Sequence, residues 1–239
     1  MPRFLFVWSV THFKVSAVGR SADDDIRRMK NLIIIGARGA GREVYNTALR
    51  SKGYKDTFDV KGFLDGKGDA LDGYDNYPPI LSSVEDYQPE PDDIFVCALG
   101  EPKWRKYYAS IIIEKGGKFM TLIDPTATIG TNVQIGQGCI VREYAVISCD
   151  VTIGDFVYIQ PFADMGHDSV VGNYCHLNTR AFMGGYSKME DMAVIQTHGV
   201  LVPHKVVYKG GVIGAGSVAI RNVKAGTTVV GNPAKKIEY

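Results

Sequence analysis

In the second half of the chain, an apolar residue recurs strictly at every sixth position. Every sixth position holds an apolar side chain in sixteen consecutive hexads: Ile123, Ile129, Ile135, Val141, Ile147, Ile153, Ile159, Met165, Val171, Leu177, Met183, Met189, Ile195, Leu201, Val207 and Ile213. The position four further along is small in every hexad except the one with Lys205. An α-helix cannot use this repeat, because its faces recur every 3.6 residues, whereas short strands joined by sharp corners can.

Three such hexads would form one coil of a three-sided prism, with the apolar residues inside and the small residues at the corners. Residues 18 apart would then stack roughly 4.8 Å apart along the axis, which gives about five coils. A β-sandwich is the alternative, but its loops vary in length, and no residue is inserted or lost here. We therefore expect a parallel β-helix of hexapeptide repeats over residues 123–218 and a C-terminal tail over 219–239.

Glycine recurs at the second place of the hexad, and we expect it to serve corners that need unusual backbone angles. The members are Gly130, Gly136, Gly154, Gly166, Gly172, Gly184 and Gly214.

Strands and helices alternate in the preceding residues, 29–122, and predict a small parallel sheet of Rossmann-like α/β type. The expected strands are 32–35, 60–64, 94–99 and 119–123, and the expected helices are 42–51 and 103–115. Ligands of such sheets collect at the carboxyl ends of the strands. This rule selects Arg38, Asp65 and the turn at Gly100 and Glu101 as candidate ligand contacts.

The glycine run from Gly36 to Gly41 joins the first strand to the first helix. Unpaired backbone N–H groups at such a helix start suit a phosphate, and the guanidinium of Arg38 pairs well with anions. A nicotinamide dinucleotide is the competing ligand, but the order is G-x-x-G-x-G and the domain lacks a second mononucleotide half. The glycines could also serve only close packing of the helix on the strand.

Composition restricts the remaining classes. The net charge of +1 and the absence of a basic patch interleaved with aromatic residues argue against nucleic acid and a membrane surface as partners. The four cysteines form no C-x-x-C pair, which is typical of reduced packing thiols in a cytoplasmic protein. The apolar run 4–10 is too short to span a membrane. We expect Met29 to be the natural start and residues 1–28 to be a poorly ordered extension.

Histidines break the hexad pattern at several corners. His167 and Asp168 occupy the third and fourth places of one hexad, and His176 occupies the sixth place of the next. A neutral imidazole is a suitable general base near neutral pH, and a neighbouring carboxylate can orient its ring. Adjacent residues of a flat strand point to opposite faces, so this pairing needs corner geometry or an acid from another subunit.

Two other interpretations of the histidines stay open. A zinc site would need histidines near multiples of 18, and only weak approximations of that spacing occur. Solvated corner histidines are the simplest alternative, and His198 and His204 also occupy the fourth place of two hexads. The 18-residue stacking also predicts one column that contains Asp168, Tyr186 and His204.

The segment Met165–Gly172, with His176 nine residues after His167, and the tail Val230–Lys235 together resemble the left-handed β-helix sugar acyltransferases. These are the sialic acid O-acetyltransferase family, which includes the UDP-4-amino-sugar N-acetyltransferases. The resemblance covers about residues 30–239. It implies a left-handed coil, acetyl-CoA as co-substrate, no metal, and a homotrimer with active sites between subunits.

The resemblance also implies roles for individual residues. His167 would be the general base, with Asp168 where the family often has Glu. Contacts to acetyl-CoA would come from His176, Thr197 and Ala215, and contacts to the sugar nucleotide from Arg38, Asp65 and Pro102, beside Gly100 and Glu101. Arg38 replaces a small residue of the family and Pro102 lies where an Asn is usual, so the sugar and the nucleotide stay open.

The expected reaction is direct acetyl transfer to an amino or hydroxyl group of a nucleotide sugar in bacterial glycan biosynthesis. A covalent intermediate is not expected, because Ser169 and Cys175 occupy inward places. The alternatives are a non-sugar acceptor such as an amino acid, a metal-dependent hydratase on the same prism, and a non-catalytic trimeric scaffold.

Overall fold

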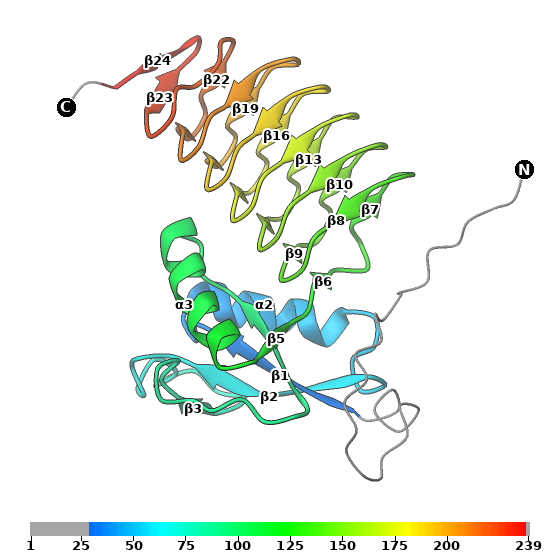
Figure 1. Cartoon of the computed structure of the whole chain (residues 1–239), viewed down its shortest axis with the longest axis vertical. Helices are drawn as coiled ribbons and strands as arrows, with labels where there is room; N and C mark the ends of the chain where they lie inside the picture. Colours follow the sequence, from blue (N-terminus) through cyan, green and yellow to red (C-terminus); the bar gives the residue numbers. More distant parts are fainter. Residues whose placement is uncertain (1–28, 238–239) are drawn as a thin grey trace, which may run out of the picture.

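The computed structural model describes residues 29–237, and the expectation about residues 1–28 lies outside this range. Within it the chain forms a small α/β domain followed by a long solenoid of stacked coils (Figure 1). The α/β domain lies at the end of the solenoid where the first coils begin, and the C-terminal strands lie at the opposite end.

The α/β domain contains a five-stranded sheet in the order β3-β2-β1-β4-β5, in which every neighbouring pair is parallel. The strands are β1 Lys30–Ile35, β2 Phe58–Leu64, β3 Ile80–Ser82, β4 Asp93–Cys97 and β5 Lys118–Phe119, and the helices are α2 Gly39–Arg50 and α3 Pro102–Glu114. The predicted Rossmann-like parallel sheet is confirmed. Strand β3 was not expected, and α2 begins three residues earlier than predicted, inside the glycine run.

Both faces of this sheet are covered. One apolar cluster joins the sheet to Val44 and Ala48 of α2 and also to Ile140 and Tyr158 of the solenoid. A second cluster joins the opposite face to Ile112 of α3. The first of these clusters therefore crosses the boundary between the two domains and fixes how they are placed relative to each other.

Between residues 122 and 219 the described chain forms seventeen strands of two residues each, spaced six residues apart. They are β6 Leu122–Ile123, β7 Thr128–Ile129, β8 Gln134–Ile135, β9 Ile140–Val141, β10 Val146–Ile147, β11 Thr152–Ile153, β12 Tyr158–Ile159, β13 Asp164–Met165, β14 Val170–Val171, β15 His176–Leu177, β16 Phe182–Met183, β17 Lys188–Met189, β18 Val194–Ile195, β19 Val200–Leu201, β20 Val206–Val207, β21 Val212–Ile213 and β22 Val218–Ala219.

Every third strand pairs in parallel, 18 residues apart, so the solenoid has three flat sheets. We name each sheet after the strand that it takes from the third coil: the β12 sheet (β6, β9, β12, β15, β18, β21, β23, β24), the β13 sheet (β7, β10, β13, β16, β19, β22) and the β14 sheet (β8, β11, β14, β17, β20). The α/β domain packs on the β12 sheet.

The interior of the solenoid follows the six-residue repeat. The apolar position is buried from Val141 to Ile213, and the small position is buried beside it in the same cluster. The first coil is the exception: Ile123 and Ile135 are only partly buried and Ile129 is 38% exposed, because no coil lies beneath them. The predicted prism with its apolar residues inside is confirmed.

The corners correct one expectation. Positive φ angles recur at the fourth place of the hexad, from Asn132 (φ 59°) through Asp168 (φ 56°) to Gly216 (φ 64°). The glycines at the second place have no positive φ; they allow the coils to approach closely instead. A Cβ at Gly166 would lie 2.4 Å from the backbone nitrogen of Gly185 in the next coil. These glycines are therefore needed for coil-to-coil packing and not for unusual backbone angles.

The C-terminal residues close the solenoid. Strand β23, Thr228–Gly231, pairs in parallel with β21, and β24, Ala234–Lys236, returns antiparallel to β23. The hydroxyl of Ser217 accepts a hydrogen bond from the Gly231 amide at 2.9 Å. Across residues 29–237, no helix combines the length and the apolar character that crossing a bilayer requires.

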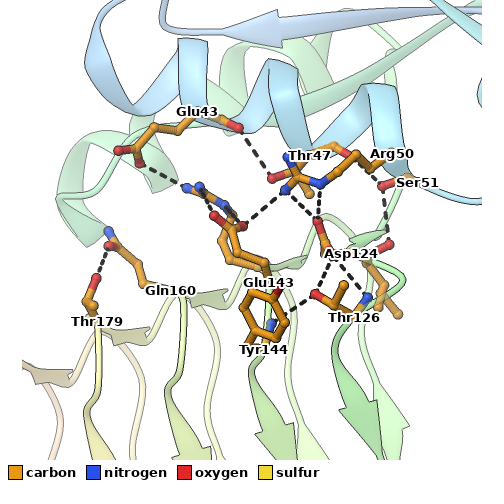
Figure 2. A network of polar contacts seen from close by, with 12 residues as sticks. Glu43, Thr47, Arg50, Ser51, Asp124, Thr126, Glu143, Tyr144, Gln160 and Thr179 are labelled. Atoms are coloured by element: carbon orange, nitrogen blue, oxygen red, sulfur yellow. Dashed lines mark hydrogen bonds and ion pairs between the residues drawn. The ribbon is translucent and has the colours of Figure 1, made fainter.

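Ion pairs reinforce the contact between α2 and the solenoid (Figure 2). Arg50 of α2 donates from Nε and Nη2 to the buried carboxylate of Asp124, at 3.0 and 2.6 Å. The Arg142 guanidinium of the solenoid reaches back to Glu43 of α2 at 2.9 Å and pairs with its own neighbour Glu143. The polar contacts thus hold α2 against the first coils and fix the direction in which its N-terminus points.

Candidate active site

A cavity of about 260 Å³ opens at the carboxyl ends of β1, β2 and β4. Arg38, Asp65 and Gly100, three of the residues selected from the sequence, line it together. Glu101 and Pro102 follow Gly100 but are not part of the lining: Glu101 is exposed at the N-cap of α3, and Pro102 is buried in its first turn. The sequence rule for parallel sheets therefore located the cavity.

The three glycines of the turn have different tasks. Gly36 has a φ of +94°, which a side chain would strain, and a Cβ at Gly41 would lie 1.8 Å from the carbonyl oxygen of Gly36. A Cβ at Gly39 would meet nothing within 4 Å. Close packing of the helix on the strand therefore requires glycine at position 41, as expected, but not at position 39.

The N-terminus of α2 faces this turn without a side-chain cap, and its first turn holds no acidic residue. Its unpaired N–H groups and the exposed Arg38 favour an anionic group. The carboxylate of Asp65 is fixed nearby, because it accepts hydrogen bonds from the amides of Ala37 and Lys67, both at 3.0 Å. The cavity therefore offers both a positive and a negative group to a ligand.

His167 and Asp168 lie at the corner between the β13 and β14 sheets. His167 Nδ1 is 2.8 Å from Asp168 Oδ2, and both side chains are exposed. The positive φ of Asp168 turns its side chain towards the preceding residue, so the corner geometry expected from the sequence makes this pair within one chain. An ionised carboxylate can only accept, so Nδ1 carries the hydrogen and the lone pair lies on Nε2.

The groups around the His167 ring come from the coils above and below. The ring packs edge-on against Tyr186 with centroids 5.1 Å apart, and a Cβ added at Gly185 would lie 2.9 Å from Nε2. One coil below, the Asp150 carboxylate accepts from Asn132 at 2.9 Å, and this hydrogen bond helps to hold the pKa of Asp150 below its usual range.

Sequence reasoning missed Gly185 and Asp150, although the 18-residue stacking places both next to residues 167 and 168. The expected column is confirmed, because Tyr186 stacks on His204 with centroids 5.0 Å apart and an angle of 5° between the rings.

His176 lies on the β12 sheet, against the α/β domain. Its ring is 5% exposed and stacks on Tyr158 with centroids 5.0 Å apart. Nδ1 is 2.6 Å from the carbonyl oxygen of Gly100, and Nε2 is 3.2 Å from the side-chain amide of Gln160. Burial, with a further effect from the nearby charge of Arg105, lowers the pKa of His176 to about 3, so its imidazole is neutral at ordinary pH.

Thr197 and Ala215 lie one above the other at the corner between the β12 and β13 sheets, and both are exposed. The amide of Gly216, which follows Ala215, donates to the carbonyl of Thr197 at 2.9 Å. This corner is not the one that carries His167. Within one chain, the structure does not bring these two residues together with the histidine.

The cavity and His167 also lie apart in one chain. The cavity borders Gly100, which contacts His176 on the β12 sheet, whereas His167 occupies the corner between the other two sheets. In a three-sided prism, that corner is opposite the β12 sheet. Within one chain, the structure therefore does not bring the cavity and His167 together.

Metal coordination and a covalent intermediate would each need particular side chains in the site. Among residues 29–237, no group of three or more His, Cys, Asp or Glu side chains is arranged to hold a metal ion. Cys97, Cys139 and Cys175 are buried free thiols, and burial raises the pKa of each to about 12. The Ser169 hydroxyl is buried and donates to the Gly166 carbonyl at 2.7 Å. None of these three thiols, nor this hydroxyl, is open to a substrate. The fourth thiol, Cys149, is half-buried in the coil below His167, where its carbonyl accepts from the Asp168 amide at 3.2 Å.

Comparisons with known proteins agree with this geometry. Residues 110–230, about half of the chain, match the family model described as the GMPPB C-terminal domain, and residues 31–112 match the PglD N-terminal domain. No curated protein matches the chain.

Among solved structures, the chain is similar to the acetyltransferase domain of PglB from Neisseria gonorrhoeae FA1090 in complex with acetyl coenzyme A. The TM-score is 0.79 at 27% identity, over 88% of this chain and 100% of that one. PerB from Caulobacter crescentus, in complex with CoA and GDP-perosamine, has a TM-score of 0.79 at 22% identity, over 88% and 99% of the two chains. WeeI from Acinetobacter baumannii AYE has a TM-score of 0.58 at 23% identity, over 87% and 100%. The last two show likeness of fold.

Proposed function

We propose a reaction from one premise: the chain belongs to the GMPPB C-terminal domain family, and it is a left-handed β-helix sugar acetyltransferase. The reaction is transfer of the acetyl group of acetyl-CoA to an amino or hydroxyl group of a nucleotide sugar. The observation that carries this proposal is the exposed His167–Asp168 pair, joined at 2.8 Å with Nε2 open.

The acceptor binds in the cavity of the α/β domain. Its diphosphate lies at the N-terminus of α2, where unpaired N–H groups and Arg38 provide positive charge, and Asp65 accepts hydrogen bonds from hydroxyl groups of the ligand. Glu101 and Pro102 follow the cavity edge at Gly100, and we assign them to the outer part of the acceptor site. PerB, which shares the fold, was crystallised with a nucleotide sugar, GDP-perosamine.

His167 acts as the general base. Nε2 takes the proton of the attacking amine or hydroxyl while the new C–N or C–O bond forms at the thioester carbonyl carbon. The C–S bond then breaks and coenzyme A leaves as the thiolate, which accepts a proton. Asp168 accepts the Nδ1 hydrogen bond and stabilises the imidazolium between these steps. Ser169 and Cys175, the two nucleophiles considered from the sequence, are both buried, which supports direct transfer without a covalent intermediate.

Each complete site takes its parts from two chains. The cavity of one copy faces the His167 corner of another, since the two lie on opposite sides of a single solenoid. We propose a homotrimer, which gives three equivalent sites in a closed ring. Thr197 and Ala215 are exposed at the corner between the β12 and β13 sheets, and they provide the surface for the pantetheine of acetyl-CoA. The resemblance predicted a contact from His176 to acetyl-CoA. Because the residue is 5% exposed and both ring nitrogens have partners within the chain, we assign His176 to the acceptor cavity instead.

The test is an acetylation screen on the full chain. Purified protein is incubated with acetyl-CoA and either UDP- or GDP-linked amino sugars, the matching hydroxyl sugars, or free amino acids, and thiol release and product mass are measured. We expect turnover with at least one nucleotide sugar. Turnover with free amino acids alone would overturn the choice of acceptor, and release of no CoA from any acceptor would overturn the reaction.

A further inference from the structure

The guanidinium of Arg105 joins the two domains in an unusual way. Its side chain comes from α3, is 1% exposed, and has no carboxylate partner among the ion pairs of residues 29–237. Instead, five hydrogen bonds run from it to backbone carbonyl oxygens on both domains. Burying a charge is costly unless it is fully hydrogen-bonded, so this arrangement depends on all of these acceptors being in place.

Three of the five acceptors belong to the solenoid. Nε donates to Phe156 at 2.9 Å, and Nη2 donates to Tyr174 and Cys175 at 2.7 and 3.0 Å. These residues lie where the chain passes from the β14 sheet to the β12 sheet. The β14 sheet begins at the corner that carries His167, so Arg105 holds one end of a sheet whose other edge carries the proposed base.

The remaining two acceptors belong to the edge of the cavity. Nη1 donates to the carbonyls of Leu99 and Gly100, at 2.6 and 3.0 Å, and both residues line the cavity. The Gly100 carbonyl also accepts from His176 Nδ1 at 2.6 Å. One carbonyl at the cavity edge is therefore held by two buried side chains, one from each domain.

His176 is suited to this task because both of its ring nitrogens have fixed partners. The Gly100 carbonyl can only accept, so Nδ1 carries the hydrogen, and Nε2 accepts from the amide of Gln160. Stacking on Tyr158 fixes the plane of the ring. With its pKa lowered to about 3, the ring does not change charge in the range where an acetyltransferase works, so it holds Gly100 equally at any such pH.

We propose that Arg105 and His176 are positioning residues for the acceptor: they fix the Leu99–Gly100 edge of the cavity against the solenoid. This inference rests on the proposed function, because it assumes that the cavity holds the acceptor. In this proposal, neither Arg105 nor His176 contacts the reacting atoms. Their effect is on the shape of the binding site, so losing them weakens acceptor binding more than it slows the chemical step.

Two pairs of variants test the proposal. Arg105→Met removes the five hydrogen bonds at similar length, and Arg105→Lys keeps the charge and part of the donors. His176→Phe keeps the stacking and removes the Nδ1 donor, whereas His176→Asn places an amide donor near the Nδ1 position. Lys103→Met, on the exposed surface of α3, is the matched control.

We expect Arg105→Met and His176→Phe to raise KM for the nucleotide sugar roughly tenfold to hundredfold, as for loss of hydrogen bonds at a charged or buried partner. KM for acetyl-CoA and kcat at saturating acceptor should change little. Arg105→Lys and His176→Asn should recover part of the loss, and Lys103→Met should match the wild type. An unchanged acceptor KM in folded His176→Phe, or an equal loss in kcat and both KM values, would overturn the proposal.

Binding of UDP and GDP by calorimetry separates this inference from the proposed function, because it needs no turnover. If the wild type binds one of them and His176→Phe weakens binding, the positioning role holds even where no acetyl transfer is seen. If Arg105→Met does not fold, His176→Phe decides alone, because it leaves the guanidinium and its carbonyl partners intact. Equal binding by wild type and His176→Phe would overturn the positioning role while leaving the reaction untouched.

Discussion

The two halves of the candidate site are built on different physical principles. The His167 corner belongs to a repeating frame, in which a positive φ recurs at the fourth place of the hexad from Asn132 to Gly216 while the side chain there changes. The acceptor cavity belongs to irregular turns whose shape depends on single contacts, such as those from Arg105 to Leu99 and Gly100. The comparison indicates that side chains at a solenoid corner can be exchanged with local effects, whereas changes at the cavity alter structure as well as binding.

The largest effect is expected at the corner. His167→Ala should lower kcat by roughly 10² to 10⁴, as for loss of a general base. Oligomeric state and thermal stability should match the wild type, because the side chain is exposed. His204→Ala, in the neighbouring column, is the control and should retain activity. Steady-state kinetics measure kcat, light scattering measures the oligomeric state, and thermal unfolding measures the stability. Near-full turnover in His167→Ala would contradict the assignment of the base.

The glycine turn at residues 36–41 tests whether changes at the cavity alter structure as well as binding. Gly41→Ala places a methyl group 1.8 Å from the Gly36 carbonyl, so it should destabilise the chain by about 2–4 kcal/mol and abolish nucleotide binding. Gly39→Ala meets nothing within 4 Å in the chain and should leave the free energy of unfolding unchanged. Urea unfolding and calorimetry with UDP or GDP distinguish the two. Equal behaviour of the two variants would show that the turn is not held by close packing.

The contact between the domains predicts a pH dependence. His176 has a pKa of about 3 in the folded chain and about 6.5 when free, since burial disfavours its charged form. As the pH falls below about 6.5, the unfolded chain takes up a proton that the folded chain does not, so stability decreases. Between about pH 7 and 5 the loss is about 2 kcal/mol. Urea unfolding at several pH values should show this slope in the wild type, and His176→Phe should lack it; parallel curves would argue against the buried neutral ring.

The smallest effect is expected from crowding the base without removing it. Gly185→Ala places a methyl group 2.9 Å from His167 Nε2, at a position without a positive φ, so the ring must shift. We expect kcat to fall on the order of tenfold, with stability close to that of the wild type, because displaced catalytic groups lose their alignment. Gly68→Ala, at a position with nothing within 4 Å and no positive φ, is the control for glycine loss. A variant with normal kcat would mean that the substrate does not approach Nε2 from this side.

Most of the solenoid could be predicted because its physics is local and periodic. An apolar residue every sixth position determines which side chains are buried, and the 18-residue stacking determines which neighbours meet, as Tyr186 and His204 do. The same rule would have found Gly185 and Asp150 beside the candidate base. The role of the second-place glycines was predicted wrongly, because a period shows where a small residue is needed but not whether φ or a neighbouring coil requires it.

The sequence by itself determined the three-sided coil, the parallel sheet and the edge of that sheet where Arg38 and Asp65 meet, since each follows from spacing along the chain. Only the tertiary structure decided that Asp168 turns towards His167, that His176 is buried against Gly100, and that Arg105 binds carbonyls of both domains. These three depend on a corner angle or on contacts between residues far apart in sequence, and no local pattern encodes the direction in which one domain faces another.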